Sequence, residues 1–222
     1  MIELREVSKS YTLKGVTKTI FDGFSYRFPR DRNVAIVGPN GMGKSTLMRL
    51  IAGSEMPDAG QIIRSGRTSW PLGFAGGFNG SMTGLENIRF VSRVYGQDTE
   101  TIIDYVQAFS ELGKSLDLPI RTYSNGMKAR LAFGLSMAID FDCYLIDEIT
   151  AVGDEAFRRK SQAVFEDKLG HSQIIMISHS GATLKSYCDC GLLLAPDGVF
   201  FFDDVEDMLR DYHQRFGSND KA

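Results

Sequence analysis

The sequence has little cysteine, no excess of positive charge and no long apolar run, and each absence excludes a class of protein. Three cysteines are too few for a disulfide framework and indicate a reducing compartment. The net charge of −3 gives no electrostatic case for nucleic acid or an anionic membrane surface. No apolar run approaches the roughly 18 residues that span a bilayer, and the first residues lack a signal peptide's basic and apolar regions. We expect a soluble protein that reaches a membrane only through a partner.

A metal site at Cys188-Asp189-Cys190 is an alternative use of these cysteines. The chain offers no second cysteine pair, and His171, His179 and His213 are scattered along it. Because the ligand spacing of a zinc site is missing, we expect no metal at this position.

A phosphate loop is the strongest signal that the chain does contain. Residues 38–46 read GPNGMGKST, fit the pattern G-x-x-x-x-G-K-[ST] and follow the apolar run 34–37. The glycines let backbone N–H groups turn inward around an anion, and the following helix adds its positive N-terminal dipole. The alternative is a glycine-rich turn that contains a lysine by chance. We expect ATP or GTP to be bound by Gly38, Asn40, Gly41, Gly43, Lys44, Ser45 and Thr46. Lys44 would contact the β- and γ-phosphates, and Ser45 would ligate Mg²⁺.

Hydrophobic periodicity predicts an α/β protein. Alternation at 2–4 and 24–28 indicates half-buried strands, whereas apolar runs at 143–146 and 174–177 indicate buried parallel strands. Turn residues bracket another pair of short strands between 56 and 66. A hairpin is expected around Pro196-Asp197-Gly198.

Helical spacing dominates residues 83–139, which are expected to form a helical subdomain. Thr83 and Glu86 have the spacing of a capping box, and a last amphipathic helix is expected over 205–216. Residues 69–80 combine four glycines with the single tryptophan and two phenylalanines. Because periodicity fails there, we expect a loop.

Two carboxylates, Asp147 and Glu148, follow the apolar run 143–146. The carboxyl ends of strands in α/β sheets present ligand-binding groups. Asp147 suits the surroundings of Mg²⁺, and Glu148 suits a general base or a group that orients water for attack on the γ-phosphate. The alternative is a solvated acidic pair, but the phosphate loop upstream favours the catalytic interpretation.

Ser124-Asn125-Gly126 stands where a predicted helix begins. A hydroxyl, backbone amides and the helix dipole converge at such a position and form a second anion site. An ordinary N-cap explains the same residues locally. The order of the motifs favours the anion site, because Ser178-His179 after the run 174–177 completes a set with the phosphate loop and Asp147-Glu148.

This order of motifs resembles the ATP-binding-cassette ATPases over nearly the whole chain. The match extends to the ATPase subunits of capsular-polysaccharide exporters of the KpsT type, through residues 69–72, 123–133, 141–148, 151–154 and 186–189. The resemblance implies a P-loop NTPase fold with a RecA-like core.

The resemblance also implies how the chain is divided. It implies one domain over 1–222, in which 1–82 and 140–222 form the catalytic core with an antiparallel β-subdomain. Residues 83–139 would then be the helical subdomain that carries the signature motif.

Further site residues follow from the resemblance. Tyr11 matches the aromatic residue that stacks on adenine, although it could equally be a core strand residue. Ser124 and Gly126 match the signature motif, which completes the site of the opposite subunit in a head-to-tail homodimer. Asp154 matches a loop aspartate that spans the dimer interface, and His179 matches the switch histidine at the γ-phosphate.

The chain also departs from the family pattern. Asn125 and Met127 replace a glycine and a glutamine of the generic signature. No glutamine lies between Trp70 and Thr83, where the family has one that contacts the metal, and Phe74, nearest by spacing, cannot ligate Mg²⁺.

The function implied is that of a peripheral ATPase subunit at the cytoplasmic face of the inner membrane. ATP would close two copies, and hydrolysis would reopen them and move an integral-membrane ABC-2 permease that exports lipid-linked capsular polysaccharide. The permease is expected to dock near residues 69–80, and no nucleic acid is expected as a partner. The other interpretation of 69–80 is a loop packed on its own subdomain.

Three alternative functions stay open. One is a soluble cassette ATPase that acts as a nucleotide-gated scaffold, and another is the ATPase of an O-antigen or teichoic acid exporter. A small-molecule phosphotransferase would also use the phosphate loop, but it leaves Ser124-Asn125-Gly126 and His179 unexplained as a set.

Overall fold

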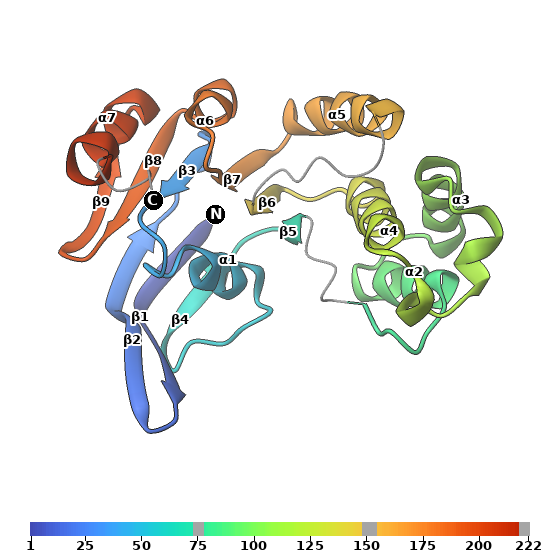
Figure 1. Cartoon of the computed structure of the whole chain (residues 1–222), viewed down its shortest axis with the longest axis horizontal. Helices are drawn as coiled ribbons and strands as arrows, with labels where there is room; N and C mark the ends of the chain where they lie inside the picture. The colour runs from blue at the N-terminus through green and yellow to red at the C-terminus, as the bar shows by residue number, and fades with distance from the viewer. Residues whose placement is uncertain (73–77, 148–154, 218–222) are drawn as a thin grey trace. The chain divides into compact units, whose positions relative to one another are not determined.

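The chain folds into two compact units in the computed structural model, which describes residues 1–72, 78–147 and 155–217. Figure 1 shows the elements of both units along the chain. The first unit comprises Met1–Pro71, Asp142–Glu148 and Ser172–Ala222, and the second comprises Leu72–Phe141 and Ile149–His171. The segment 83–139, expected to be a helical subdomain, therefore lies in the second unit together with a later helix.

A three-stranded antiparallel sheet begins the first unit. Its strands are β1 (Ile2–Leu13), β2 (Val16–Arg27) and β4 (Ala59–Arg64), in the order β2-β1-β4. Ile2 and Leu4 are buried, which confirms the half-buried strand expected from their alternation.

A six-stranded sheet forms the centre of the first unit. Its strands are β3 (Val34–Val37), β5 (Thr68–Leu72), β6 (Cys143–Asp147), β7 (Gln173–Ile177), β8 (Cys190–Ala195) and β9 (Gly198–Phe202), in the order β5-β6-β7-β3-β8-β9. Strands β6, β7, β3 and β8 are parallel, whereas β9 pairs antiparallel with β8. The expected parallel strands and the hairpin at 196–198 are thus confirmed.

Three helices pack in the first unit: α1 (Lys44–Ala52), α6 (Gly181–Tyr187) and α7 (Val205–Phe216). Helix α1 buries Leu47, Met48, Leu50 and Ile51 in a core shared with β1 and β3. Figure 1 shows α6 and α7 beside β8 and β9. Helix α7 is confirmed as amphipathic, because Met208 and Leu209 are buried.

The second unit contains α2 (Gly84–Val94), α3 (Thr99–Ser110), α4 (Asn125–Ala138) and α5 (Glu155–Leu169), with short 3₁₀ turns at Gly113–Asp117 and Ile120–Thr122. Phe109 of α3 links three helices, since its ring centroid lies 5.8 Å from that of Phe133 and 5.4 Å from that of Phe157. The capping box at the start of α2 is confirmed: Glu86 N donates to Thr83 Oγ1 at 3.1 Å, and Thr83 N donates to Glu86 Oε2 at 2.8 Å.

Two local predictions were wrong. Residues 69–80 are not a loop throughout, because β5 continues to Leu72 despite Pro71. The Ser69 hydroxyl, fully buried, accepts a hydrogen bond from Leu145 N at 2.8 Å and ties this strand to β6. The strand pair expected between 56 and 66 is also absent from the described structure, where the only strand of that segment is β4 and the chain then joins the other sheet.

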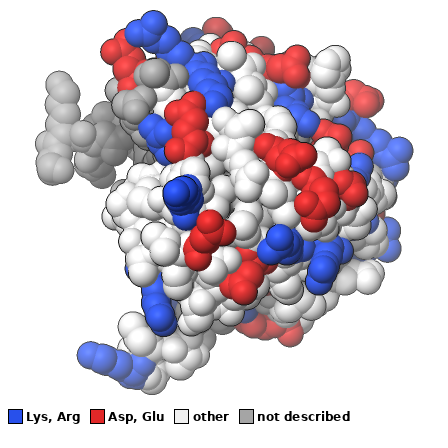
Figure 2. Space-filling view, turned by 90° about the vertical axis from the view of Figure 1, so that its right-hand side faces the viewer, with Lys and Arg blue, Asp and Glu red and all other residues white. Residues whose placement is uncertain are grey.

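The described surface carries charges of both signs. On the face seen in Figure 2, acidic and basic side chains are interspersed with neutral residues. Among residues 1–72, 78–147 and 155–217, no helix combines the length and apolar character required to cross a bilayer.

Candidate nucleotide-binding site

The phosphate loop connects the buried strand β3 to α1, as the sequence predicts. Gly38, Gly41 and Gly43 have φ values of 153°, 82° and 94°, which side chains rarely adopt. A Cβ on Gly38 would lie 2.2 Å from the Leu194 carbonyl oxygen, and one on Gly43 would lie 2.3 Å from Ile20 Cγ2. Local packing therefore requires glycine at both ends of the loop.

Helix α1 begins without a side-chain cap. Its N-cap is Gly43, in a left-handed conformation, and its first turn carries no acidic residue. The first backbone N–H groups of a helix have no partner within the helix, and an anion is the ligand that best satisfies them. The backbone here is thus arranged for phosphate rather than for an intrinsic cap.

Two ammonium groups lie at this loop. Lys44 Nζ donates to the carbonyl oxygens of Gly38 at 2.6 Å and Pro39 at 3.1 Å. Lys18 Nζ, from β2, donates to Gly41 O at 3.0 Å. The motif predicts Lys44 but not Lys18, whose only sequence signal is its place in an exposed strand.

The carboxyl ends of three neighbouring strands bring the remaining predicted groups of this unit together. Ile36 of β3 pairs with Ile177 of β7, which pairs with Asp147 of β6, so these residues form one row across the sheet. The phosphate loop follows β3, and the exposed His179 follows β7. Asp147 and His179 therefore share a sheet edge with the phosphate loop.

The oxygen donors at this edge suit Mg²⁺. Ser45 is exposed at the start of α1, and Asp147 is half-buried at the end of β6. Hydroxyl and carboxylate oxygens are preferred Mg²⁺ ligands, and phosphate oxygens of a bound nucleotide complete such sites. In the described part of the chain, no group of three or more His, Cys, Asp or Glu could hold a metal by itself.

Tyr11 is held beside α1 through its hydroxyl group. The hydroxyl donates to Glu55 Oε1 at 2.6 Å, and Arg49 donates to the Tyr11 oxygen at 3.1 Å and to Thr46 Oγ1 at 3.2 Å. Lys9 Nζ lies 5.5 Å from the centre of the ring. With 37% of its surface exposed, Tyr11 is not a core strand residue.

Glu55 is the charge that organises this network. Burial raises the pKa of Glu55, but hydrogen bonds from Tyr11, Arg49 and Lys9 together outweigh that effect and leave the pKa below its ordinary value. The carboxylate is therefore ionised at neutral pH and fixes the orientation of the Tyr11 hydroxyl.

Ser124 caps α4 in the second unit. Its hydroxyl accepts a hydrogen bond from Met127 N at 3.2 Å, and its φ and ψ of −63° and 161° are those of an N-cap residue. Ser124 and Gly126 are both exposed, and the first turn of α4 has no acidic residue. The local structure satisfies one amide and leaves this helix end accessible to solvent.

Three other predicted positions lie outside the described residues: Glu148, Asp154 and Phe74. The cysteines are free and buried, and burial raises the pKa values of Cys143 and Cys188 to about 12. They are therefore protonated at neutral pH.

Comparisons with known proteins agree with this geometry. A family model described as ABC transporter matches residues 21–151. The polysialic acid transport ATP-binding protein KpsT of Escherichia coli is 48% identical over 215 residues, which cover 96% of this chain and 98% of that protein. The capsule polysaccharide export ATP-binding protein CtrD of Neisseria meningitidis serogroup B is 43% identical over 213 residues, covering 96% and 99%.

A solved structure shares the fold. It is the dimeric post-hydrolysis state of the ATP-binding cassette MJ0796 bound to ADP and Pi, with a TM-score of 0.70 and 16% identity. The match covers 90% of this chain and 98% of that one.

Proposed function

Because the chain belongs to the ABC transporter family, we propose that it is the ATP-hydrolysing subunit of an exporter of capsular polysaccharide. Its fold is that of the P-loop nucleotide-binding domain of this family, with an α/β core, an antiparallel β-sheet and a helical part. The observation that carries the proposal is the phosphate loop, whose glycine geometry and uncapped helix suit a nucleotide triphosphate.

Catalysis in this proposal is mainly positioning and charge neutralisation of the γ-phosphate. Lys44 leaves the carbonyl oxygens of the loop and binds the β- and γ-phosphates. Ser45 and Asp147 would hold Mg²⁺, which would neutralise phosphate charge. His179 donates to the γ-phosphate, and Glu148 orients or deprotonates the attacking water.

Adenine binding is the role proposed for Tyr11. The Glu55 and Arg49 contacts fix the hydroxyl end of the side chain, while the exposed part of the ring is available for stacking. Thr46 belongs to the same network and to the first turn of α1. The network thus connects the base contact to the phosphate loop.

A second copy of the chain would complete each site. Ser124 and Gly126 would contact the γ-phosphate held by the opposite subunit, and Asp154 would lie at the dimer interface. The exposure of the α4 N-terminus supports this arrangement, because only an accessible helix end can meet another subunit. Members of the family dimerise, and the solved relative MJ0796 is a dimer.

A membrane permease of the ABC-2 type is the proposed partner, docked near residues 69–80 at the cytoplasmic face of the inner membrane. Residues 73–77 of that segment lie outside the described residues. Helix α2 belongs to the same unit as residues 78–80, the described end of that segment. Its Phe90 and Val94 side chains are 58% and 62% exposed. Four residues apart on one helix, these side chains form an apolar strip suited to a partner.

Purification from membranes tests the proposal. A tagged chain extracted in mild detergent should bring with it a multi-span protein, and a Lys44→Ala control should keep that partner while losing ATP hydrolysis. Cells that carry only the Lys44→Ala variant should retain polysaccharide inside the cell. Isolation with soluble proteins only would instead support the nucleotide-gated scaffold.

A further inference from the structure

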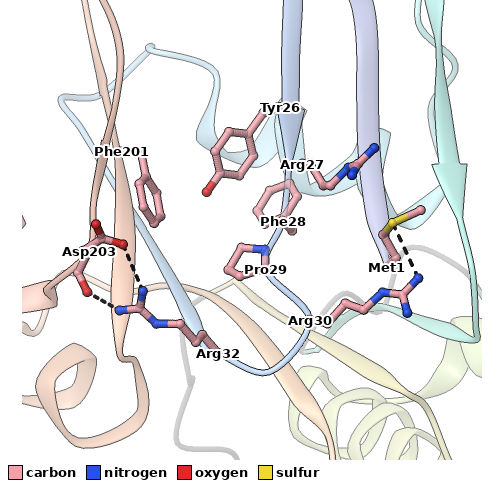
Figure 3. Close-up of a pocket in the computed structure, with 9 residues that line it drawn as sticks. All are labelled: Met1, Tyr26, Arg27, Phe28, Pro29, Arg30, Arg32, Phe201 and Asp203. Atoms are coloured by element: carbon pink, nitrogen blue, oxygen red, sulfur yellow. Dashed lines mark hydrogen bonds and ion pairs between the residues drawn. The ribbon is translucent and has the colours of Figure 1, made fainter.

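A pocket of about 640 Å³ lies in the first unit, away from the phosphate loop. Its lining comes from Met1, the end of β2, the residues that precede β3, and β9 with the residue that follows it (Figure 3). The phosphate loop follows the opposite end of β3, so the two sites lie at different edges of the sheet. The volume is within the range of roughly 300–1,000 Å³ that is typical of small-molecule sites.

Aromatic and apolar side chains form one wall of the pocket. Tyr26, Phe28 and Phe201 come together there, with the Tyr26 ring centroid 4.9 Å from that of Phe28 and 6.0 Å from that of Phe201. Phe201 is 41% exposed, although it is a large apolar residue. Such a wall suits a flat ring or another apolar body.

Positive charge predominates in the lining, which contains three arginines and one aspartate. Arg32 is compensated, because it donates to Asp203 Oδ1 at 3.0 Å and to the Asp203 carbonyl oxygen. Arg27 is compensated by Glu3 Oε1 at 3.0 Å. Arg30 contacts Met1 Sδ at 3.7 Å and has no carboxylate partner in the described part of the chain. Its charge is available to a ligand.

The Tyr26 hydroxyl is a second available donor. It points into the pocket in Figure 3 and has no hydrogen-bond partner among residues 1–72, 78–147 and 155–217. Burial raises the pKa of Tyr26, so the hydroxyl keeps its proton at neutral pH. Tyr26 is half-buried, and its hydroxyl can donate to an acceptor that binds in the pocket.

We propose that this pocket binds a small organic anion, with its carboxylate or phosphate held by Arg30 and Tyr26 and its apolar ring against Phe201. A guanidinium group binds either oxyacid through paired hydrogen bonds. The aromatic wall selects a ligand that carries a ring, and it disfavours a free inorganic ion. This site is separate from the ATP site and does not depend on it.

An NMR titration of the full chain tests the site directly. The probes are phenyl phosphate and phenylacetate, with inorganic phosphate and benzyl alcohol as the two separate halves of the ligand. The nucleotide site is saturated beforehand with a non-hydrolysable ATP analogue and Mg²⁺. We expect at least one ring-bearing anion to shift the amide signals of Arg30 and Phe201, and to bind about tenfold more tightly than either half. Whichever of the two anions binds with the higher affinity shows whether the site prefers a phosphate or a carboxylate.

Three variants decide between this site and general surface binding. Arg30→Gln should weaken the ring-bearing anion about tenfold, and Tyr26→Phe about threefold, since the ring stays in place. Arg89→Gln, an equal charge change on the exposed face of α2, should have no effect. Unchanged affinity in both pocket variants would overturn the proposal. So would equal binding of inorganic phosphate, or the absence of shifts with either ring-bearing anion at millimolar concentration.

Discussion

Helices α1 and α2 begin in opposite ways: the first turn of α2 is built for stability, and the first turn of α1 is built to bind a ligand. Helix α2 starts with a reciprocal capping box, in which Thr83 and Glu86 satisfy each other's backbone amides. Helix α1 starts with a left-handed Gly43, and neither a capping side chain nor an acidic residue stands in its first turn. The start of α2 is complete without a ligand, whereas that of α1 is arranged to receive one.

The other end of α1 shows that this lack of a cap is local. Gly53 adopts a left-handed conformation and closes the helix through backbone hydrogen bonds. Arg64 donates to the carbonyl oxygens of Ile51 at 2.6 Å and Leu50 at 2.5 Å. The carbonyl oxygens of Arg49, Leu50 and Ile51 therefore have partners within the protein at this end of α1, where no ligand is expected.

The largest effect on ATP binding is expected from an acidic residue introduced into the first turn of α1, which has none. In Ser45→Asp, a carboxylate would occupy the place of the phosphate charge, so we expect ATP affinity to fall by a factor of about 100 or more. The free energy of unfolding should stay equal or rise by about 0.5 kcal/mol, because the acid favours the helix N-terminus. Fluorescent-nucleotide titration and urea unfolding measure the two effects.

Ser45→Ala is the control for this variant, because it removes the hydroxyl without adding charge. If Ser45→Ala and Ser45→Asp weakened ATP binding equally, the loss would reflect the hydroxyl alone, and the electrostatic interpretation of the start of α1 would be wrong.

Removing the ammonium group at the start of α1 should have the next largest effect. We expect Lys44→Ala to lower the ATP hydrolysis rate by a factor of roughly 100–1,000, as for other charge-stabilising groups at reacting centres. Lys18→Ala should lower it less, since its ammonium contacts the loop through Gly41 O only. A phosphate-release assay at saturating ATP compares them, and equal losses would contradict the distinction.

Breaking the capping box of α2 should affect stability alone. Thr83→Ala is expected to lower the free energy of unfolding by about 1 kcal/mol, because it leaves the Glu86 amide without its acceptor. The ATP hydrolysis rate per folded molecule should not change. Urea unfolding measures the stability, with Arg89→Ala on the exposed face of α2 as the control, and a loss of hydrolysis rate would show that α2 is coupled to the site.

The network beside α1 should give a smaller effect. Tyr11→Phe keeps the ring but removes the hydroxyl that binds Glu55 and Arg49, so we expect a loss of about 0.5–1.5 kcal/mol in the free energy of unfolding. ATP affinity should fall only a few-fold, and Tyr11→Ala should lower it further. Equal affinities for the two variants would exclude stacking of adenine on Tyr11.

The pH dependence of the same network is the smallest effect. The pKa of Glu55 lies below its ordinary value in the folded chain, so its stabilisation is present above the unfolded pKa and is lost as pH falls through the folded pKa. The stability difference between the native chain and Glu55→Gln should therefore shrink below the ordinary glutamate pKa of 4.5. A difference that grew in acid would mean that the sign is wrong.

The features that the sequence predicts well are short and local. The phosphate loop and the capping box at Thr83 each depend on a few adjacent residues whose conformational preferences agree with the fold. The position of Asp147 at the carboxyl end of a buried strand was also predicted, because strands of α/β sheets present ligand-binding groups at these ends.

Other features depend on contacts between distant residues, which periodicity does not encode. Strand β5 contains Pro71 and lies next to glycines, yet the Ser69 hydroxyl secures it to β6. Lys18 reaches the phosphate loop from an exposed strand without alternation. The pocket pairs Tyr26 with Phe201, which come from opposite ends of the chain.

The central claim is that the open start of α1 is half of an ATP site and that Ser124 of a second copy supplies the other half. Light scattering after gel filtration in Mg²⁺-ATP tests it most directly. Glu148→Gln, which should bind ATP without hydrolysing it, is predicted to elute with the mass of two 24.7 kDa chains. Adding Ser124→Arg should return the mass to one chain while ATP binding persists. A dimer that survives Ser124→Arg, or no dimer in Glu148→Gln, would contradict the account.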